Sequence, residues 1–499
     1  MYWLNENSKI FLSKGYLMEG VTAEERIREI AKKAETYLNK PGFADKFYDY
    51  MSKGFYSLAS PVWSNYGLKR GLPISCFSSY IADDMSRILY THAEVGMMTK
   101  YGGGTAGHFA GLRPRGAPIK DNGTSSGSVH FMELFDNLIN IVSQGSVRRG
   151  HFAPYLPVEH KDIEEFLNIG TEGHPIQEST YAVTVTDAWL KAMVEGDEEK
   201  RKTWAKIIQR RTEIGYPYIL FSDTVNNNTV DVYKDKKMKI HGSNLCSEIC
   251  LPTSDEISFV CCLSSINIRH YKEWKDTDAV ETLVMFLDTV ITDFLENLEV
   301  LKNSEDPEKQ TAFYFMQRAY KFAKEHRALG LGVLGWHTYL QENNIPVESD
   351  EANSLNKEIF KLIKEKSYKA SADMATEYGE PEILKGYGRR NTTLLAIAPT
   401  TSSAFILGQV SQGIEPYMSN AFVKDVDKMK VTIKNPALVE LLEAKGQNTP
   451  EVWGSIRDND GSVQHLAFLT PHEKMVFRTF SEIDQKVIIN QAAKKKKYI

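Results

Sequence analysis

The chain is organised around one stretch, Gly242-Ser243-Asn244-Leu245-Cys246-Ser247-Glu248-Ile249-Cys250-Leu251-Pro252. A thiol stands in it between a carboxamide and a carboxylate, each two residues away. If the segment is extended, its side chains alternate between two faces, so Asn244, Cys246 and Glu248 point the same way. Glycine, serine and proline at the flanks are typical of a chain reversal. The stretch therefore predicts a tight loop that holds a cysteine inside a cavity. The alternative interpretation, a small buried hydrophobic residue, is the commoner fate of a free cysteine.

Composition indicates an ordinary globular protein. The chain has 499 residues, of which 42% are hydrophobic and 25% charged, so it can bury a large core. Its net charge of −5 comes from interspersed acids and bases, which argues against a general nucleic-acid or membrane-surface binder. The N-terminus does not resemble a secretory signal, and no run of apolar residues is long enough to span a membrane. We therefore expect an intracellular protein.

The five cysteines predict reduced thiols rather than a metal site. They are Cys76, Cys246, Cys250, Cys261 and Cys262. None forms a C-x-x-C pair, and no histidine lies close to them at the spacing of a zinc finger. In a chain of this size without a secretory signal, cysteines are typically free.

Alternating strand and helix patterns predict an α/β fold. Strand-like segments at 55–64, 73–80, 214–221, 258–268 and 392–399 are separated by helical patterns at 22–52, 85–100, 129–142, 279–301 and 312–326. This order predicts a largely parallel sheet or barrel with the site in loops at one end. Cys76, Cys246 and Cys261 each lie on an extended or strand-like segment, and two thiols close in space can supply two electrons by forming a disulfide.

Two further sequence patterns are candidates for phosphate binding, and only the second is kept as a candidate. The glycines of Gly330-Leu331-Gly332-Val333-Leu334-Gly335 have dinucleotide-binding spacing, but a polar helical pattern precedes them instead of a strand, so we exclude that site. The hydroxyls of residues 400–403 follow a predicted strand and Pro399. They could hold a diphosphate at a helix start, or form an ordinary helix cap.

Several motifs, taken together and in this order, resemble the large subunit of class I ribonucleotide reductase. They are Ser75-Cys76, Asn244-Leu245-Cys246-Ser247-Glu248, Cys261 before Leu263-Ser264, Ala398-Pro399-Thr400-Thr401-Ser402-Ser403 and Gly413-Ile414-Glu415-Pro416. The likeness covers nearly the whole chain and is closest to the compact form of some bacteria and bacteriophages. It implies a ten-stranded α/β barrel with a central finger loop. The expected organisation is an N-terminal helical region (1–54), the barrel (55–470) and a C-terminal helix (471–499).

The resemblance also implies a role for each site residue. Cys246 would carry a transient thiyl radical, Glu248 would accept the proton of the 3′-hydroxyl, and Asn244 would hold the 2′-hydroxyl. Cys76 and Cys261 would reduce the product and end as a disulfide, and Cys262 would face away. The substrate diphosphate would be held by Ser60, Ser75, Thr400, Thr401, Ser402 and Ser403. Effector binding would involve Asp83, Arg113, Lys120, Arg148 and Arg149, with residues 148–157 relaying effector identity to the substrate base.

The implied partners follow from the same resemblance. The substrate would be a ribonucleoside diphosphate, and the radical would come from a small metal-containing subunit. ATP, dATP, dTTP or dGTP would act as effectors, and thioredoxin or glutaredoxin would re-reduce the disulfide. We expect a homodimer in the cytoplasm (of the host, if phage-encoded), with no covalently bound cofactor, no metal of its own, no direct nucleic-acid contact and no membrane contact.

Two departures from the family pattern stand at the ends of the chain. There is no room for the N-terminal ATP-cone, so overall activity regulation by that domain is not expected. No Tyr-Tyr dipeptide occurs, and no cysteine follows Cys262, whereas the family continues to a tyrosine pair and a tail with two cysteines. We expect the N-terminal piece of a split subunit, completed by a separate C-terminal polypeptide through the face of Ile483, Val487 and Ile488. A truncated, inactive product is the competing interpretation.

Other classes of protein are less consistent with these residues. A cobalamin-dependent class II reductase shares the three cysteines, but Leu245 and Ser247 beside the central one favour class I. A nucleotide-binding subunit without turnover would not need the set of Asn244, Cys246 and Glu248. A glycyl-radical enzyme needs a C-terminal glycine motif, which this sequence does not contain.

Overall fold

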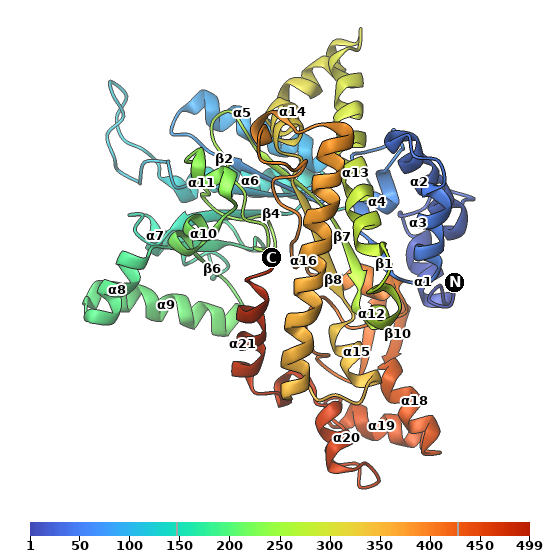
Figure 1. Cartoon of the computed structure of the whole chain (residues 1–499). Helices are drawn as coiled ribbons and strands as arrows, with labels where there is room; N and C mark the ends of the chain where they lie inside the picture. The colour runs from blue at the N-terminus through green and yellow to red at the C-terminus, as the bar shows by residue number, and fades with distance from the viewer. Residues whose placement is uncertain (146–147, 427–428) are drawn as a thin grey trace.

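A curled sheet of eight strands forms the middle of the molecule (Figure 1). The structure is a computed structural model that describes residues 1–145, 148–426 and 429–499. The strands of the sheet are β1 (Tyr56–Leu58), β2 (Cys76–Tyr80), β3 (Gly104–His108), β4 (Phe152–Pro157), β5 (Ala182–Val185), β6 (Tyr218–Phe221), β7 (Phe259–Asn267) and β8 (Leu329–Leu334). A separate hairpin consists of β9 (Ala421–Val426) and β10 (Met429–Lys434).

The sheet is mixed, with the change of direction at β7. Strands β2 to β6 are parallel neighbours, whereas β7 runs antiparallel to β1 and β2 and parallel to β8. The predicted alternation of strands and helices is therefore confirmed. The strand predicted at 392–399 is present in the described residues only as a bridge between Leu331 and Leu395.

Helices surround the sheet, and α13 and α16 run side by side (Figure 1). Those of the first half are α1 (Glu6–Ser13), α2 (Ala23–Leu38), α3 (Phe43–Ser52), α4 (Ser60–Asn65), α5 (Met85–Lys100), α6 (Ser128–Ile141), α7 (Ile163–Phe166), α8 (Asp187–Glu195), α9 (Glu198–Ile214), α10 (Ser222–Asn228) and α11 (Asp231–Asp235). Those of the second half are α12 (Tyr271–Trp274), α13 (Ala279–Lys302), α14 (Pro307–His326), α15 (Trp336–Glu342), α16 (Asp350–Tyr378), α17 (Thr401–Ile406), α18 (Pro436–Ala444), α19 (Pro450–Asp458), α20 (Pro471–Val476) and α21 (Gln485–Lys495).

Two predicted elements are divided by local backbone chemistry. The single helix expected over 22–52 is α2 and α3, because Asn39 (φ 48°) and Gly42 (φ 88°) adopt left-handed conformations on either side of Pro41. The strand expected over 55–64 is three residues of β1 followed by α4, which has proline in its first turn.

The C-terminal helix packs on the chain itself. Ile483 is 4% exposed and belongs to the main core. Helix α21 lies against α16, where Asn356 Nδ2 donates to the Gln491 carbonyl at 3.1 Å. Val487 and Ile488 are half-buried. The face predicted to receive a separate polypeptide is thus partly used inside this chain, and Ile483 is unavailable to a partner.

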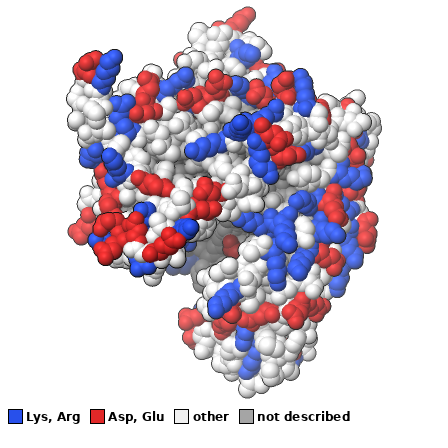
Figure 2. Space-filling model, turned by 60° about the vertical axis from the view of Figure 1, so that its left-hand side comes forward, with Lys and Arg blue, Asp and Glu red and all other residues white. Residues whose placement is uncertain are grey.

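The surface carries both signs of charge. Figure 2 shows acids and bases interspersed over most of one face, with basic side chains gathered beside a hollow near its middle. In the described ranges, no helix is both long and apolar enough to cross a membrane.

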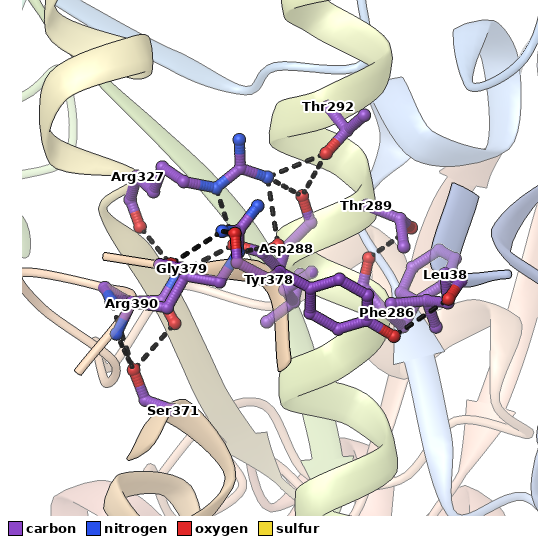
Figure 3. Close-up of polar contacts among 12 residues, drawn as sticks. Leu38, Phe286, Asp288, Thr289, Thr292, Arg327, Ser371, Tyr378, Gly379 and Arg390 are labelled. Atoms are coloured by element: carbon purple, nitrogen blue, oxygen red, sulfur yellow. Dashed lines mark hydrogen bonds and ion pairs between the residues drawn. The ribbon is translucent and has the colours of Figure 1, made fainter. Parts of the chain in front are cut away.

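A buried carboxylate on α13, Asp288, ties the helices to the sheet (Figure 3). Asp288 Oδ1 accepts from Arg327 Nε and its Oδ2 accepts from Arg390 Nε, both at 2.8 Å. Arg390 also donates to the backbone oxygen of Tyr378 at the end of α16, where helix carbonyls carry partial negative charge. Burial alone would raise the pKa of Asp288, but the two guanidinium charges outweigh it and lower that pKa to about 2.

This cluster fixes the start of two adjacent stretches of chain. Arg327 stands just before β8, and Asn391 just before the segment that bridges to it. Asn391 Nδ2 donates to Asp288 Oδ1 at 3.0 Å and to the Arg327 carbonyl at 2.9 Å. The segment leads to residues 400–403, so the cluster anchors one wall of the site described below.

Replacing Asp288→Asn should destabilise the protein strongly, because two buried guanidinium groups lose their counter-charge. Breaking a buried ion pair typically costs about 3–5 kcal/mol. Chemical denaturation followed by circular dichroism measures the change. The control is Asp373→Asn, which removes an exposed pair with Lys369 on α16 and should leave the unfolding midpoint unchanged. Equal midpoints for the two variants would contradict the anchoring role of Asp288.

Candidate active site

The loop around Cys246 is a turn held inside the curled sheet. Ser247 N–H donates to the Asn244 carbonyl at 3.2 Å, and Ser247 has a left-handed backbone with φ 72°. The extended conformation with three side chains on one face is therefore wrong, because the turn reverses the chain after Cys246. Asn244 is completely buried, whereas Cys246 is exposed, unlike the buried Cys76, Cys261 and Cys262. The predicted loop with a cysteine at its tip is present.

The Asn244 side chain organises this turn. Its Oδ1 accepts from the backbone N–H of Glu248 at 3.0 Å and of Ile249 at 3.1 Å. Its Nδ2 donates to Cys76 Sγ at 3.2 Å. One carboxamide thus closes the loop and connects it to a thiol on β2.

Cys76 and Cys261 stand directly opposite each other on antiparallel strands β2 and β7. Side chains of directly opposed residues project from the same face of a sheet. Cys262 lies on the other face, where its thiol approaches the Leu287 carbonyl of α13 at 3.4 Å. The pairing brings two of the three predicted redox thiols together and leaves Cys262 outside.

A cavity of about 240 Å³ joins the thiols to the hydroxyl-rich segment. Of the residues predicted for the site, it is lined by Cys76, Cys246, Glu248, Ser60, Ser75, Thr400, Thr401, Ser402 and Ser403. Asn244 lies behind this lining and reaches it through Cys76. The predicted residues from four separate parts of the sequence therefore meet at one cavity.

The lining also includes residues that were not predicted for the substrate site, and four of them are of interest. Ser264 and Ser265 follow Cys261 on β7, Gly104 opens β3, and Arg148 comes from the segment expected to relay effector identity. The sequence contains a signal that could have identified Ser264 and Ser265, because they are two adjacent hydroxyl residues in an otherwise apolar strand pattern.

The cavity favours the protonated form of its thiols and brings the pKa of Glu248 close to neutral pH. Burial raises the pKa of Glu248 to about 7, and its Oε2 has no hydrogen-bond partner in the described chain. Although part of the Cys246 side chain is exposed, desolvation inside the cavity and the nearby Glu248 carboxylate raise its pKa to about 12, and Arg148 opposes this. Burial also raises the pKa of Cys76 and Cys261 far above that of a free thiol. At neutral pH the sulfurs hold hydrogen, whereas the carboxyl can gain or lose a proton.

The residues predicted for effector binding fall in two places. Asp83 and Arg113 form an ion pair at 2.7 Å, and Arg113 Nη1 also donates to the Pro118 carbonyl, close to the exposed Lys120. Arg148 instead lines the thiol cavity, with a buried Nη1 that has no hydrogen-bond partner in the described chain. Arg149 is exposed.

No metal centre accompanies these groups in the part of the chain that the structure describes. There, no group of three or more histidine, cysteine, aspartate or glutamate side chains is placed to hold a metal ion.

Known proteins provide an independent comparison. The family model described as the ribonucleotide reductase barrel domain matches residues 74–200, 197–384 and 381–499. The chain is 37% identical over 486 residues to a protein named as the ribonucleoside-diphosphate reductase large subunit of Frog virus 3 (isolate Goorha), covering 93% of this chain and 83% of the relative. It is 30% identical over 565 residues to that of Invertebrate iridescent virus 3, covering 98% and 86%.

A solved structure agrees with these matches. The class Id ribonucleotide reductase alpha subunit of Actinobacillus ureae superposes with a TM-score of 0.92 at 55% sequence identity, covering 100% of this chain and 90% of that one. The predicted fold of the ribonucleotide reductase type is thereby confirmed, and the alternative classes are not favoured. The chain belongs to the large (alpha) subunits of class I ribonucleotide reductase.

Proposed function

We propose that this chain reduces ribonucleoside diphosphates to deoxyribonucleoside diphosphates at the cavity around Cys246. The observation that carries the proposal is the placement of Cys76 opposite Cys261 beside an accessible third thiol and a carboxyl group with one oxygen free of hydrogen bonds in the described chain. Two facing thiols supply the two electrons and two protons that removal of a hydroxyl as water requires.

Each side chain then has one task. Cys246, as a thiyl radical, takes the 3′ hydrogen of the ribose and later returns it. Glu248 accepts the 3′-hydroxyl proton, and Asn244 donates its second amide hydrogen to the 2′-hydroxyl. The 2′-hydroxyl leaves as water while Cys76 and Cys261 become a disulfide. The balance is one diphosphate and two thiols giving one deoxy product, one water and one disulfide.

Binding and regulation would use the remaining predicted residues. The hydroxyls of Ser60, Ser75 and residues 400–403 line the same cavity as Cys76 and Cys246 and suit a diphosphate. A nucleoside triphosphate effector (ATP, dATP, dTTP or dGTP) would bind near Asp83, Arg113 and Lys120, where a basic loop is held by the ion pair of Asp83 with Arg113.

The reaction needs partners that this cavity does not contain. A small metal-containing subunit would generate the radical, and thioredoxin or glutaredoxin would reduce the disulfide in the cytoplasm. A second, mainly apolar groove of about 720 Å³ lies beside Glu248, between residues 393–397 and the end of α21. A separate polypeptide seated there would contact Glu248 and Cys261, which both line this groove.

A homodimer is supported by apolar side chains that face solvent on two adjacent helices. Met85 and Leu89 of α5 are 55% and 53% exposed, and Leu134 and Ile141 of α6 are 39% and 83% exposed. Helices α5 and α6 pack on each other, so these residues form a surface suited to a second copy of the chain.

Turnover tests the proposal directly. CDP reduction is measured with dithiothreitol and the small subunit, with and without a separately encoded C-terminal polypeptide. Without dithiothreitol, the parent should form no more than one deoxy product per site, and mass spectrometry should find a disulfide between Cys76 and Cys261. Cys246→Ser should abolish turnover, and Cys250→Ser, the matched control, should retain it. Full turnover by Cys246→Ser would refute the proposal.

The rate of the reaction should depend on pH through the titration of Glu248. A base must be deprotonated to accept a proton, so with a pKa of about 7 for Glu248 the rate should rise with pH and level off above about 7. Glu248→Gln should lower kcat by about 10²–10⁴-fold and remove this step. The control is Glu172→Gln at an exposed loop position, which should keep the parent profile. A parent rate that is flat between pH 6 and 8 would contradict the role of Glu248.

The dimer surface has its own test. Ile141→Asp places a charge within the apolar surface and should shift the chain toward monomer in sedimentation velocity. Ile208→Asp, at an isoleucine of α9 that is 44% exposed, should leave the dimer intact. A parent chain that sediments only as a monomer would overturn the homodimer proposal.

A further inference from the structure

Tyr155 connects two parts of the site that are far apart in sequence. It lies on β4 and is 1% exposed. Its hydroxyl donates to the Asn244 carbonyl at 2.7 Å and lies 3.2 Å from Ser247 Oγ. The same carbonyl accepts the N–H of Ser247, so Tyr155 holds the turn that displays Cys246.

The turn it holds is strained. Ser247 adopts a left-handed conformation at φ 72°, which a non-glycine residue occupies at a cost of about 1–3 kcal/mol unless its surroundings enforce it. A right-handed conformation is therefore the relaxed alternative, and it would place Cys246 and Glu248 differently. The two contacts of the Tyr155 hydroxyl hold the loop tip in the left-handed arrangement.

The base of the loop is fixed independently of Tyr155. The Ser243 carbonyl accepts from Ser78 Oγ at 3.1 Å and from His108 Nε2 at 3.0 Å. Burial lowers the pKa of His108 to about 4, so its ring is neutral and its Nδ1 accepts from Thr253. A Cβ on Gly242 would come within 2.6 Å of the His108 ring and 3.0 Å of the Tyr155 ring, so only glycine fits there. Any movement of the loop is thus confined to its tip.

Strand β4 continues directly from the segment that contains Arg148. Arg148 lines the cavity of Cys246, seven residues before Tyr155. Between them, the His151 carbonyl accepts from Thr105 Oγ1 at 2.8 Å, which ties the start of β4 to β3. One short stretch of chain therefore touches the substrate cavity at one end and the finger loop at the other.

We propose that Tyr155 is a positioning residue that couples the Arg148 segment to the conformation of the Cys246 turn. A shift of this segment on effector binding moves β4, alters the two contacts of the Tyr155 hydroxyl, and changes how Cys246 and Glu248 face the substrate. The regulatory part of this inference rests on the proposed function. The dependence of the Cys246 turn on the Tyr155 hydroxyl is independent of that function.

The first measurement is the alkylation rate of Cys246 by iodoacetamide, followed by peptide mass spectrometry on the full chain. Cys246 is exposed and the neighbouring Cys76 and Cys261 are buried, so their peptides report the selectivity of labelling. Tyr155→Phe keeps the ring and removes the hydroxyl, and it should change this rate by about threefold or more. ATP should change the rate in the parent and not in Tyr155→Phe. The matched control is Tyr378→Phe, which loses one hydroxyl bond to the Leu38 carbonyl and should behave as the parent.

The second measurement is CDP turnover with the small subunit. Tyr155→Phe should lower kcat about tenfold with the KM for CDP within twofold, and its stimulation by ATP should fall toward one. Ser247→Ala, which removes the other partner of the hydroxyl, should show the same pattern if Tyr155→Phe does not fold. Parent-like alkylation and ATP response in both variants would overturn the coupling. If the parent itself shows no turnover, the proposed function fails while the alkylation result still decides this inference.

Discussion

A polar loop runs inside a curled sheet, and its backbone groups must find hydrogen bonds there. Buried peptide groups without partners cost about as much as the hydrogen bonds they lose. Here the partners are side chains from three different strands: Ser78 from β2, His108 from β3 and Tyr155 from β4. Because Ser78 and His108 are fixed by sheet pairing, the base of the loop inherits the rigidity of the sheet. The position of Cys246 at the tip therefore depends on donors of the sheet and not on the loop alone.

The same burial that demands these bonds also sets the chemistry. It raises the pKa of Glu248, Cys76 and Cys246 in the cavity and of Cys261 opposite Cys76. The proposed reaction requires S–H groups for hydrogen-atom transfer and a carboxyl group close to its midpoint for proton abstraction. Removal of these groups from water meets both requirements.

The relative placement of Cys76, Cys261 and Cys262 could be predicted from the sequence, because these three thiols lie on strands, in which side chains alternate strictly between two faces. This alternation predicts that Cys261 and Cys262 point in opposite directions, and the two lie on opposite faces of β7. The conformation of residues 244–248 could not, since it depends on the left-handed Ser247 and on donors from distant strands. Pro41-Gly42 is a local sequence signal for the break between α2 and α3. The prediction of a single helix relied on hydrophobic periodicity and did not use that signal. The ion cluster of Asp288 joins residues about a hundred positions apart, and no spacing rule indicates it.

The opposed pair of Cys76 and Cys261 has a consequence for the resting protein. Peroxides and electrophiles react with thiolates, and a thiol whose pKa lies far above neutrality presents almost none. Burial adds a steric barrier to the same attack. If this pair supplies the electrons of the proposed reaction, its reducing equivalents are held in a form that ordinary oxidants consume slowly. The pocket would then act as a chemically insulated store for the two thiols.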